Sequence, residues 1–503
     1  MAFPHTLGEY VALLKTQGLF LRAGEADLSR PVEGLTYDDR EAGEGTLFIC
    51  KGAAFREQYL VNAYNKGAFA YVSEREYPSL PGGIIVNDVR KAMAYLARLF
   101  TSYDPASLKT VAITGTKGKS TTAFFVKSVL DTASGGKCGI VSTILNSDGV
   151  TSAEAELSTP ESVKLYKHFA AARESGLEYF VTETSSQALK YDRVLGMTFD
   201  VGCFTNLGRD HISRTEHPDM EDYFASKLKL FEHCRTACVF SGSERFEEIC
   251  AAARKNCETV LTYGFLPNDG VYCAKSELLP DGARFAVKTK ELEDEFEISM
   301  RGAFNIENAL AAVACSVSLG ISAEDIKRGL KSARVPGRME HFASEDGELN
   351  VIVDYAHNGM SLEALLGSVS REYPGIPIIS VFGSAGGKAP ERRAEMGKVS
   401  AKYSALTVIT EDDEANEPLE DICAEIAQSV RENGGEYIII PDREEAVRTA
   451  ITQTEGKKTV VLAGKGRETH QRRAEGSVKV PTDVELALKY ISLYDAEKKA
   501  AKV

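Results

Sequence analysis

The sequence lacks the features that send a protein into or across a membrane. Its first ten residues contain no basic start followed by an apolar stretch, and no later segment approaches the length of a membrane span. An excess of positive charge is also absent, because the formal net charge is -14, which repels nucleic-acid phosphates and anionic lipids. We therefore expect a cytoplasmic protein with no nucleic-acid and no membrane partner.

Closely and evenly spaced cysteines are absent as well. The ten cysteines are spread from Cys50 to Cys423, unlike the framework of a disulfide-rich secreted protein, so we expect reduced thiols. His233, Cys234 and Cys238 lie close together and could supply half of a zinc site, but no second pair follows at finger-like spacing. Buried, unreactive cysteines are the favoured interpretation.

The chain contains 503 residues, of which 43% are hydrophobic and 26% charged, as in ordinary multidomain globular proteins. Short β-branched runs alternate with helix-period segments, which is typical of α/β layers with mostly parallel sheets. We predict an α/β fold with a small N-terminal domain (1–105), a central P-loop domain (106–336) and a C-terminal Rossmann-like domain (337–503). Alternating polar and apolar residues between about 260 and 300 predict an antiparallel extension of the central sheet.

A predicted strand at 110–114 is followed by Gly115-Thr-Lys-Gly-Lys-Ser120 and then by a helical run. Glycine-rich backbone at a helix N-terminus binds phosphate, so we expect nucleotide contacts from Gly115, Thr116, Lys117, Gly118, Lys119, Ser120 and Thr121. In this pattern Lys119 reaches the β/γ-phosphates and Ser120 binds Mg²⁺. The first glycine of the full motif is missing, because Ile113 stands at its position. A Gly/Lys turn before a surface helix is the alternative.

Polar residues follow the next two predicted strands. Glu183 comes directly after the strand at 179–182, and the segment 205–211 ends in an acid and His211. Ligands bind beyond the carboxyl ends of parallel strands, so Glu183 and His211 are candidates for holding Mg²⁺ near the phosphate loop.

The order T-G-T-K-G-K-S, T-E-T-S-S and F-T-N-L-G-R-D-H resembles the central domain of Mur ligases, whose superfamily also includes folylpolyglutamate synthetase. The resemblance covers essentially the whole chain. It implies that Lys227 is carbamylated to N6-carboxylysine and binds Mg²⁺ with Ser120, Glu183 and His211. It further implies that Lys119, Glu183, His211 and Lys227 are catalytic, and that Asn305, Arg338 and Asp354 contact ATP.

The first domain resembles the uridine-nucleotide domain of the tripeptide-forming branch of that family, in the segments 37–40, 45–48 and 51–52. The resemblance implies that the UDP-linked substrate is bound by Asp39, Ser158, Thr159, Ser185 and Arg193. The chain departs from the family at Asp39, where Ser is commoner, and at Gln187, where His is commoner.

The third domain resembles the amino-acid-binding domain of the same branch. The implied contacts are Arg393, Asp412, Asp413, Ala415, Asn416, Glu417, Gly464 and Glu468. Enzymes that add meso-diaminopimelate carry Arg where this chain has Ala415, because a guanidinium pairs with the distal carboxylate. Ala415 and its acidic neighbours therefore favour L-lysine, while Glu414 in place of the common Pro leaves ornithine or another diamine open. The same reaction with meso-diaminopimelate is a further alternative. Arg467 replaces the usual His.

The resemblance implies an ATP-dependent ligase that adds L-lysine to the D-Glu of UDP-N-acetylmuramoyl-L-alanyl-D-glutamate through an acyl phosphate. Such an enzyme works in peptidoglycan precursor synthesis, and so in cell-wall biogenesis, cell shape and division. We expect a monomer. The alternatives are a folylpolyglutamate-type ligase, a P-loop switch or motor, and a non-catalytic nucleotide-binding scaffold.

Overall fold

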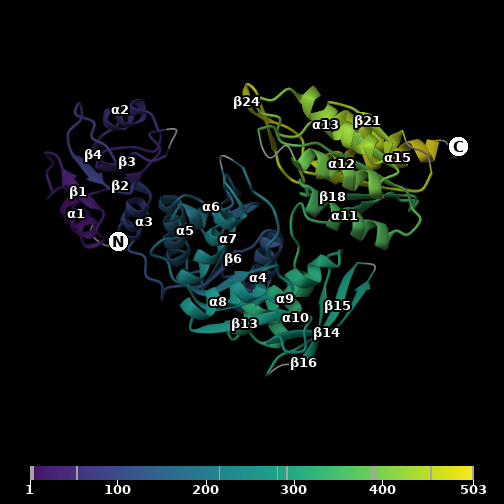
Figure 1. The fold of residues 1–503 in the computed structure, drawn as a ribbon, viewed down its shortest axis with the longest axis horizontal. Helices are drawn as coiled ribbons and strands as arrows, with labels where there is room; N and C mark the ends of the chain where they lie inside the picture. Colours follow the sequence, from purple (N-terminus) through teal and green to yellow (C-terminus); the bar gives the residue numbers. More distant parts are fainter. Residues whose placement is uncertain are drawn as a thin grey trace.

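The chain forms three successive α/β units, called the N-terminal, central and third layers below (Figure 1). The structure is a computed structural model that describes residues 5–52, 55–213, 216–279, 281–290, 293–387, 391–453 and 456–500. Each layer contains one main sheet, and each sheet lies within one of the three predicted domains. The predicted α/β class is confirmed, and the domain boundaries stay a prediction. Among the described residues, no helix has both the length and the apolar character needed to cross a bilayer.

The N-terminal sheet has five strands in the order β1-β5-β4-β3-β2, all parallel except β1. Its strands are β1 (Phe20–Ala23), β2 (Gly34–Thr36), β3 (Thr46–Ile49), β4 (Ala68–Ser73) and β5 (Gly83–Val86). Its helices are α1 (Leu7–Thr16), α2 (Glu57–Asn65) and α3 (Val89–Phe100). The buried face of α3 packs on α5 (Ser162–Glu174) of the central layer, so one apolar core runs through both layers.

The central sheet has eleven strands, and β6 lies between β11 and β10 with both neighbours parallel to it. The parallel strands are β6 (Lys109–Thr114), β7 (Cys138–Val141), β10 (Tyr179–Glu183), β11 (Phe199–Phe204), β12 (Cys234–Phe240) and β13 (Thr259–Gly264). The helices are α4 (Lys119–Ser134), α5 (Ser162–Glu174), α6 (Ser186–Lys190), α7 (Met220–Leu228), η1 (Lys229–His233), α8 (Phe246–Asn256), α9 (Phe304–Ser318) and α10 (Ala323–Ser332). Since parallel strands end at the same edge, Thr114, Glu183 and Phe204 lie side by side.

Antiparallel strands extend both ends of this sheet. One end carries the hairpin β8 (Leu145–Ser147) and β9 (Ser152–Glu154). At the other end β14 (Val271–Leu279) pairs in parallel with β13, and the antiparallel pairs then run from β14 to β15 (Gly282–Lys288) and from β15 to β16 (Glu293–Ile298). The predicted antiparallel extension is confirmed for β14 to β16. It begins later than expected, because α8 provides a crossover that lets β13 pair in parallel with β12.

The third sheet has the order β17-β18-β22-β19-β20-β21, and only the edge strand β17 is antiparallel. Its strands are β17 (Glu340–Ala343), β18 (Leu349–Asp354), β19 (Ile378–Phe382), β20 (Leu406–Ile409), β21 (Tyr437–Ile439) and β22 (Lys458–Ala463), and a separate hairpin joins β23 (His470–Arg473) to β24 (Gly476–Lys479). Helices α11 (Gly359–Glu372), α12 (Glu391–Tyr403) and α13 (Leu419–Glu432) share one core with the sheet, while α14 (Arg443–Thr452) and α15 (Asp483–Ala500) share the other. Helices therefore cover both faces, as in a doubly wound sheet.

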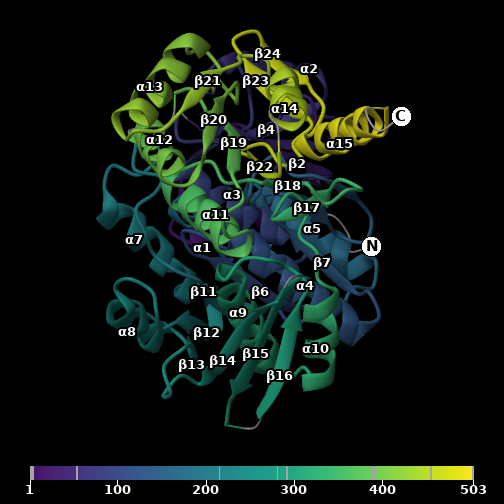
Figure 2. The ribbon, with the colours of Figure 1, turned by 90° about the vertical axis from the view of Figure 1, so that its right-hand side faces the viewer.

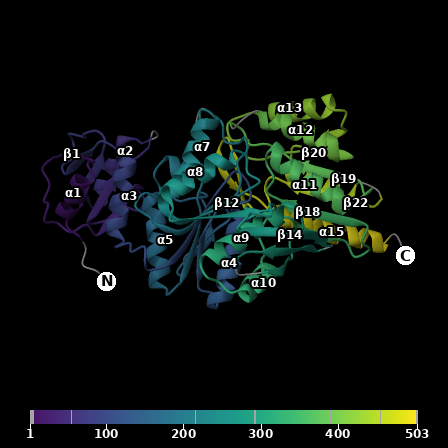
Figure 3. The ribbon, with the colours of Figure 1, turned by 60° about the horizontal axis from the view of Figure 1, so that its bottom comes forward.

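Figure 3 shows the central layer between the other two, and Figure 2 shows the third layer above the central one. Residues that follow β11 contact residues that follow β18, because the amide of Asn358 donates to the carboxylate of Asp210. The carboxyl ends of the two parallel sheets thus meet, which is where ligands bind in folds of this kind.

Candidate active site

The phosphate loop joins β6 to α4 and depends on two glycines. The backbone φ is 146° at Gly115 and 80° at Gly118, values that residues other than glycine rarely adopt. A Cβ atom on Gly115 would lie 1.9 Å from Thr205 Oγ1, and one on Gly118 would lie 2.1 Å from Asn308 Oδ1. The loop therefore packs tightly against its neighbours without the missing first glycine, and Lys119 begins the helix as a phosphate-binding loop requires.

The segment after β11 holds this loop in place. The side chain of Asn206 accepts from the backbone N–H of Lys117 at 2.8 Å and donates to its carbonyl at 3.1 Å. Thr205 Oγ1 donates to the same carbonyl at 2.7 Å, and Thr116 Oγ1 bonds both backbone groups of Gly208. Asn206 was not among the predicted site residues, although its place directly after a sheet strand could have indicated it.

Glu183 lies beside the helix start, as predicted. Its buried carboxylate accepts from Ser120 Oγ at 2.9 Å and from the backbone N–H of Thr143 at 3.0 Å. A hydroxyl and a carboxylate are hard oxygen ligands, and Mg²⁺ in nucleotide sites commonly takes one or two such groups together with phosphates. In the described part of the chain, no three His, Cys, Asp or Glu side chains gather as around a metal ion. Ser120 and Glu183 therefore fit a Mg²⁺ ion that is bound together with a nucleotide.

Lys227 lies on α7 with only 1% of its surface exposed. Its Nζ donates to the carbonyl of Gly115 at 2.6 Å and lies 4.4 Å from the centre of the Tyr223 ring. Burial, followed by repulsion from Lys119, holds the pKa of this amine well below its usual range. A neutral amine is the form that attacks CO₂, so the environment is consistent with the predicted carbamate. The modification itself stays a prediction.

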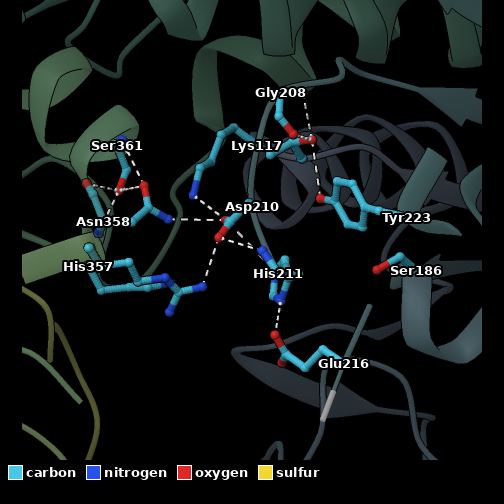
Figure 4. Close-up of polar contacts among 12 residues, drawn as sticks. Lys117, Ser186, Gly208, Asp210, His211, Glu216, Tyr223, His357, Asn358 and Ser361 are labelled. Atoms are coloured by element: carbon cyan, nitrogen blue, oxygen red, sulfur yellow. Dashed lines mark hydrogen bonds and ion pairs between the residues drawn. The ribbon is translucent and has the colours of Figure 1, made fainter. Parts of the chain in front are cut away.

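His211 follows Asp210 in a left-handed conformation with a φ of 58°. Its Nδ1 lies 3.2 Å from Glu216 Oε2, and its Nε2 lies 3.8 Å from Asp210 Oδ2 (Figure 4). These contacts turn the ring toward Glu216 and Asp210, and no contact joins it to Glu183 among the described residues. The metal-binding role of His211 therefore stays a prediction.

A second histidine, which the predicted site did not include, links α6 to α7. His217 has no exposed surface, and its Nε2 lies 2.9 Å from Ser186 Oγ while its Nδ1 lies 2.6 Å from Asp222 Oδ2. The same carboxylate oxygen accepts from Lys190 at 2.6 Å. Burial lowers the pKa of His217 despite Asp222, so the neutral ring bridges the two helices.

The predicted substrate residues surround Glu183 on its other side. Thr159 Oγ1 donates to the carbonyl of Glu183 at 2.8 Å and accepts from the backbone N–H of Ser185 at 3.0 Å. Ser158 accepts from Thr143 at 2.7 Å, and Arg193 donates to the carbonyl of Thr159 at 2.8 Å. Four residues predicted to bind the UDP-linked substrate therefore form one continuous cluster.

That cluster reaches the N-terminal layer through Glu161, which was not predicted. Its carboxylate pairs with Arg193 at 2.9 Å and with Lys51 at 2.8 Å. Burial favours the protonated acid, but Arg193 and Lys51 outweigh it and lower the pKa of Glu161. Asp39 lies apart from this pair and accepts from Asn62 of α2 at 2.8 Å.

The residues predicted to contact ATP beyond the loop lie at the junction of the second and third layers. Asn305 accepts from Asn308 at 3.0 Å, and Asn308 also lies against Gly118. The buried carboxylate of Asp354 accepts from the backbone N–H of Met339 at 3.0 Å. A cavity of about 470 Å³ opens here between the layers, and Arg338 is one of its lining residues. Its place between the layers suits a nucleotide base and ribose.

The predicted amino-acid site lies at the carboxyl ends of β20 and β22. Arg393 is buried and pairs with Glu417 at 2.7 Å and with Glu425 at 2.9 Å. Lys465 pairs with Asp413 at 2.8 Å and with Glu468 at 2.7 Å. Arg393 and Glu468, which are both predicted to contact the incoming amino acid, would have to exchange these partners for it.

Asp412 differs from the other acids of this segment. Glu411, Asp413, Glu414 and Glu417 each lie within 4.0 Å of a basic side chain. The buried carboxylate of Asp412 has no such partner among the described residues and accepts from the backbone N–H of Asp413 at 2.7 Å. Gly464 approaches it closely, since a Cβ there would lie 2.9 Å from Asp412 Oδ2. Ala415 is partly buried with a φ of 52°, and Asn416 is exposed.

Two family models match the chain. Residues 113–316 match the model described as the Mur ligase middle domain, and residues 337–466 match the one described as the Mur ligase, glutamate ligase domain. They cover the layers that hold the phosphate loop and the predicted amino-acid site.

Curated relatives extend the similarity to the N-terminal layer. The chain is 38% identical over 467 residues to the UDP-N-acetylmuramoyl-L-alanyl-D-glutamate–L-lysine ligase of Enterococcus faecalis, covering 91% of each chain. It is 39% identical over 476 residues to the UDP-N-acetylmuramyl-tripeptide synthetase of Lactococcus lactis subsp. cremoris, covering 92% of this chain and 95% of the relative.

Solved structures share the fold. MurF from Acinetobacter baumannii superposes with a TM-score of 0.67 at 19% identity, covering 98% of this chain and 100% of the other. A UDP-N-acetylmuramoyl-L-alanyl-D-glutamate–2,6-diaminopimelate ligase superposes with a TM-score of 0.63 at 24% identity, covering 94% of this chain and 97% of the other. The folylpolyglutamate synthase of Mycobacterium tuberculosis covers 74% of this chain and 91% of its own, with a TM-score of 0.60 and 16% identity.

Proposed function

The chain belongs to the Mur ligase family, and we propose that it joins L-lysine to the D-glutamate of UDP-N-acetylmuramoyl-L-alanyl-D-glutamate with ATP as the phosphoryl donor. The contacts of Glu183 carry this proposal. Its carboxylate bonds Ser120 at the phosphate loop, and its backbone carbonyl bonds Thr159 of the predicted substrate cluster. Transfer of a phosphoryl group between two substrates requires their sites to be adjacent, and Glu183 borders both.

The reaction has two chemical steps. In the first, the γ-carboxylate of D-glutamate attacks the γ-phosphorus of ATP, which forms an acyl phosphate and releases ADP. In the second, the α-amine of lysine attacks the acyl carbon, which forms the amide and releases phosphate. Phosphorylation is needed because a carboxylate has no good leaving group. The loop amides and Lys119 position the phosphates and stabilise the charge that develops on them.

Ser120 and Glu183 are the described residues that fit Mg²⁺, and a carbamylated Lys227 and His211 would add to them. The ion, when bound, neutralises charge on the β- and γ-phosphates. Arg193, whose guanidinium is held by Thr159 and Glu161, orients the anionic substrate beside Glu183. Closure of the third layer over the second keeps water away from the acyl phosphate.

L-lysine is favoured by Asp412 and Ala415. The buried carboxylate of Asp412 has no basic side chain within 4.0 Å among the described residues, so an ammonium group of the substrate suits it. Ala415 offers no guanidinium to the distal carboxylate of meso-diaminopimelate. The names and identities of the lysine-adding relatives support the same choice.

The test is a competition assay. The protein is incubated with UDP-N-acetylmuramoyl-L-alanyl-D-glutamate, ATP, Mg²⁺ and an equimolar mixture of lysine, ornithine and meso-diaminopimelate, and the products are identified by mass spectrometry. We expect the lysine tripeptide as the main product. A main product with meso-diaminopimelate would contradict the lysine assignment, and ATP hydrolysis with no amide product would contradict the ligase. A parallel reaction with a folate and glutamate is expected to give no product.

A further inference from the structure

Asp210 joins the phosphate loop to the third layer. Its Oδ2 accepts from Lys117 Nζ of the loop at 3.0 Å, and its Oδ1 accepts from Arg392 Nη2 of α12 at 2.8 Å. Asn358 Nδ2, which also comes from the third layer, donates to Oδ2 at 3.2 Å, and the backbone N–H of His211 donates to Oδ1 at 2.9 Å (Figure 4). One carboxylate therefore gathers donors from both layers at the mouth of the loop.

Basic side chains outnumber acidic ones around Asp210. Two cations, Lys117 and Arg392, face the single carboxylate of Asp210, and Lys119 lies close enough to Lys117 to repel it. Burial, which Asp210 only partly opposes, lowers the pKa of Lys117 to about 8. The surplus positive charge makes the mouth of the loop attractive to a further anion.

Arg392 is the cation best suited to such an anion. The side chain is largely buried, and its planar guanidinium can bind two phosphate oxygens at once. It sits on α12, directly before Arg393 of the predicted amino-acid site. Its only ion pair among the described residues is with Asp210, which also pairs with the phosphate loop.

We propose that Arg392 is a catalytic residue of the phosphoryl-transfer step. With nucleotide bound, its guanidinium leaves Asp210 and contacts the phosphoryl group that passes from ATP to the substrate carboxylate. Asp210 is a positioning residue that holds Arg392 and Lys117 at the loop until then. An arginine supplied from a separate structural unit is an efficient stabiliser of transferring phosphoryl groups. The identity of the phosphoryl acceptor rests on the proposed function. The contact between Arg392 and the phosphoryl group does not.

Three variants test the proposal. Arg392→Ala removes the guanidinium, Arg392→Lys keeps a charge without the planar fork, and Arg431→Ala removes an exposed arginine from the last turn of α13 as a control. We expect Arg392→Ala to lower kcat for tripeptide formation by about 100-fold or more, as loss of a transition-state donor does. Its KM for lysine should change much less. Arg392→Lys should recover part of the rate, and Arg431→Ala should match the wild type.

Two further measurements separate catalysis from a structural role. Added guanidinium chloride, at concentrations that leave the melting temperature unchanged, should restore part of kcat to Arg392→Ala and nothing to Arg392→Lys. Asp210→Asn removes one negative charge from the phosphate site and should tighten binding of a non-hydrolysable ATP analogue. If Arg392→Ala is folded and lowers kcat by less than about fivefold, the equivalent of a surface ion pair, the proposal is wrong.

Failure of the proposed function would look different. If the wild type makes no amide from any of the offered amines, the ligase assignment falls, but binding of the ATP analogue can still be measured. Arg392→Ala should then weaken that binding relative to ADP binding, because the contact is made to the γ-phosphoryl group. Equal losses for both nucleotides, or no loss, would overturn the role of Arg392 independently.

Discussion

The Nζ of Lys227 lies 2.6 Å from the carbonyl oxygen of Gly115, so a buried lysine from α7 reaches the first residue of the phosphate loop. The contact joins segments 112 residues apart in the chain. Because the amine is buried against the loop, a carbamate formed on it would lie beside the phosphate-binding backbone. Lys227 is consequently the most informative single position to change.

We predict that Lys227→Ala lowers the rate of tripeptide formation by at least about 100-fold. The substitution removes the amine that forms the carbamate, and with it a predicted ligand of Mg²⁺. Lys227→Arg should be equally inactive, because a guanidinium keeps the charge but forms no carbamate. Acetate or propionate should restore part of the activity to Lys227→Ala alone. The measurement is coupled ADP release with and without the acid. Wild-type-like turnover of Lys227→Ala in the absence of acid would contradict the predicted role.

Gly118→Ala should disable the loop, because the new Cβ would lie 2.1 Å from Asn308 Oδ1 in a left-handed backbone. Gly135→Ala is the matched control, since Gly135 also has a left-handed φ, of 72°, but no atom lies within 4 Å of the new Cβ. The control should cost only about 1 kcal/mol of folding free energy and leave nucleotide affinity intact. Chemical denaturation and titration with a fluorescent ATP analogue measure the two effects. Equal nucleotide affinities in the two variants would show that the close packing at Gly118 is unimportant.

Ala415→Arg should shift the preference from lysine toward meso-diaminopimelate. A guanidinium at this position offers a bidentate partner to the distal carboxylate and repels the distal ammonium of lysine. Ala415→Gln, which has similar length but no charge, serves as the control. We expect kcat/KM for lysine to fall about tenfold or more in the Arg variant and less in the Gln variant. The amine-dependent release of phosphate measures both, and an unchanged lysine preference in Ala415→Arg would contradict the assignment.

Stability should fall in mild acid because of His217. Burial lowers its pKa in the folded protein, so the unfolded chain binds more protons around its ordinary value of 6.5. The stabilising contribution is therefore fully present above that value and is lost as the pH falls below it. His217→Gln should be less stable at neutral pH, but its stability should decrease less steeply between pH 7.5 and pH 5.5, by up to about 1 kcal/mol per pH unit.

Urea denaturation at several pH values measures this slope in both proteins. His233 and His341, whose pKa values burial also lowers, contribute equally to both, so the difference isolates His217. Asp222 and Lys190 pair with each other at 2.6 Å and remain in the variant. Identical slopes would mean that folding does not shift the pKa of His217.

Local features of the sequence were enough to predict that the phosphate loop and Glu183 lie together. The phosphate loop needs only a strand, closely spaced glycines and a helix start, and Ser120 lies directly behind that loop. Glu183 could be predicted because the carboxyl ends of neighbouring parallel strands share one edge, and the structure places it 2.9 Å from Ser120. The order of motifs was also enough to predict the family, since the motif order does not depend on how the layers pack.

The tertiary structure alone decided which charges meet. Arg392 and Asp210 are 182 residues apart and come from different sheets, and no pattern around either residue indicates the other. The same holds for Lys51, Glu161 and Arg193, which join the first layer to the second. Spacing along a chain reports the faces of single helices and strands, because their repeats are local. The partner that a buried charge finds depends on how the sheets pack against one another, and only the folded chain determines that.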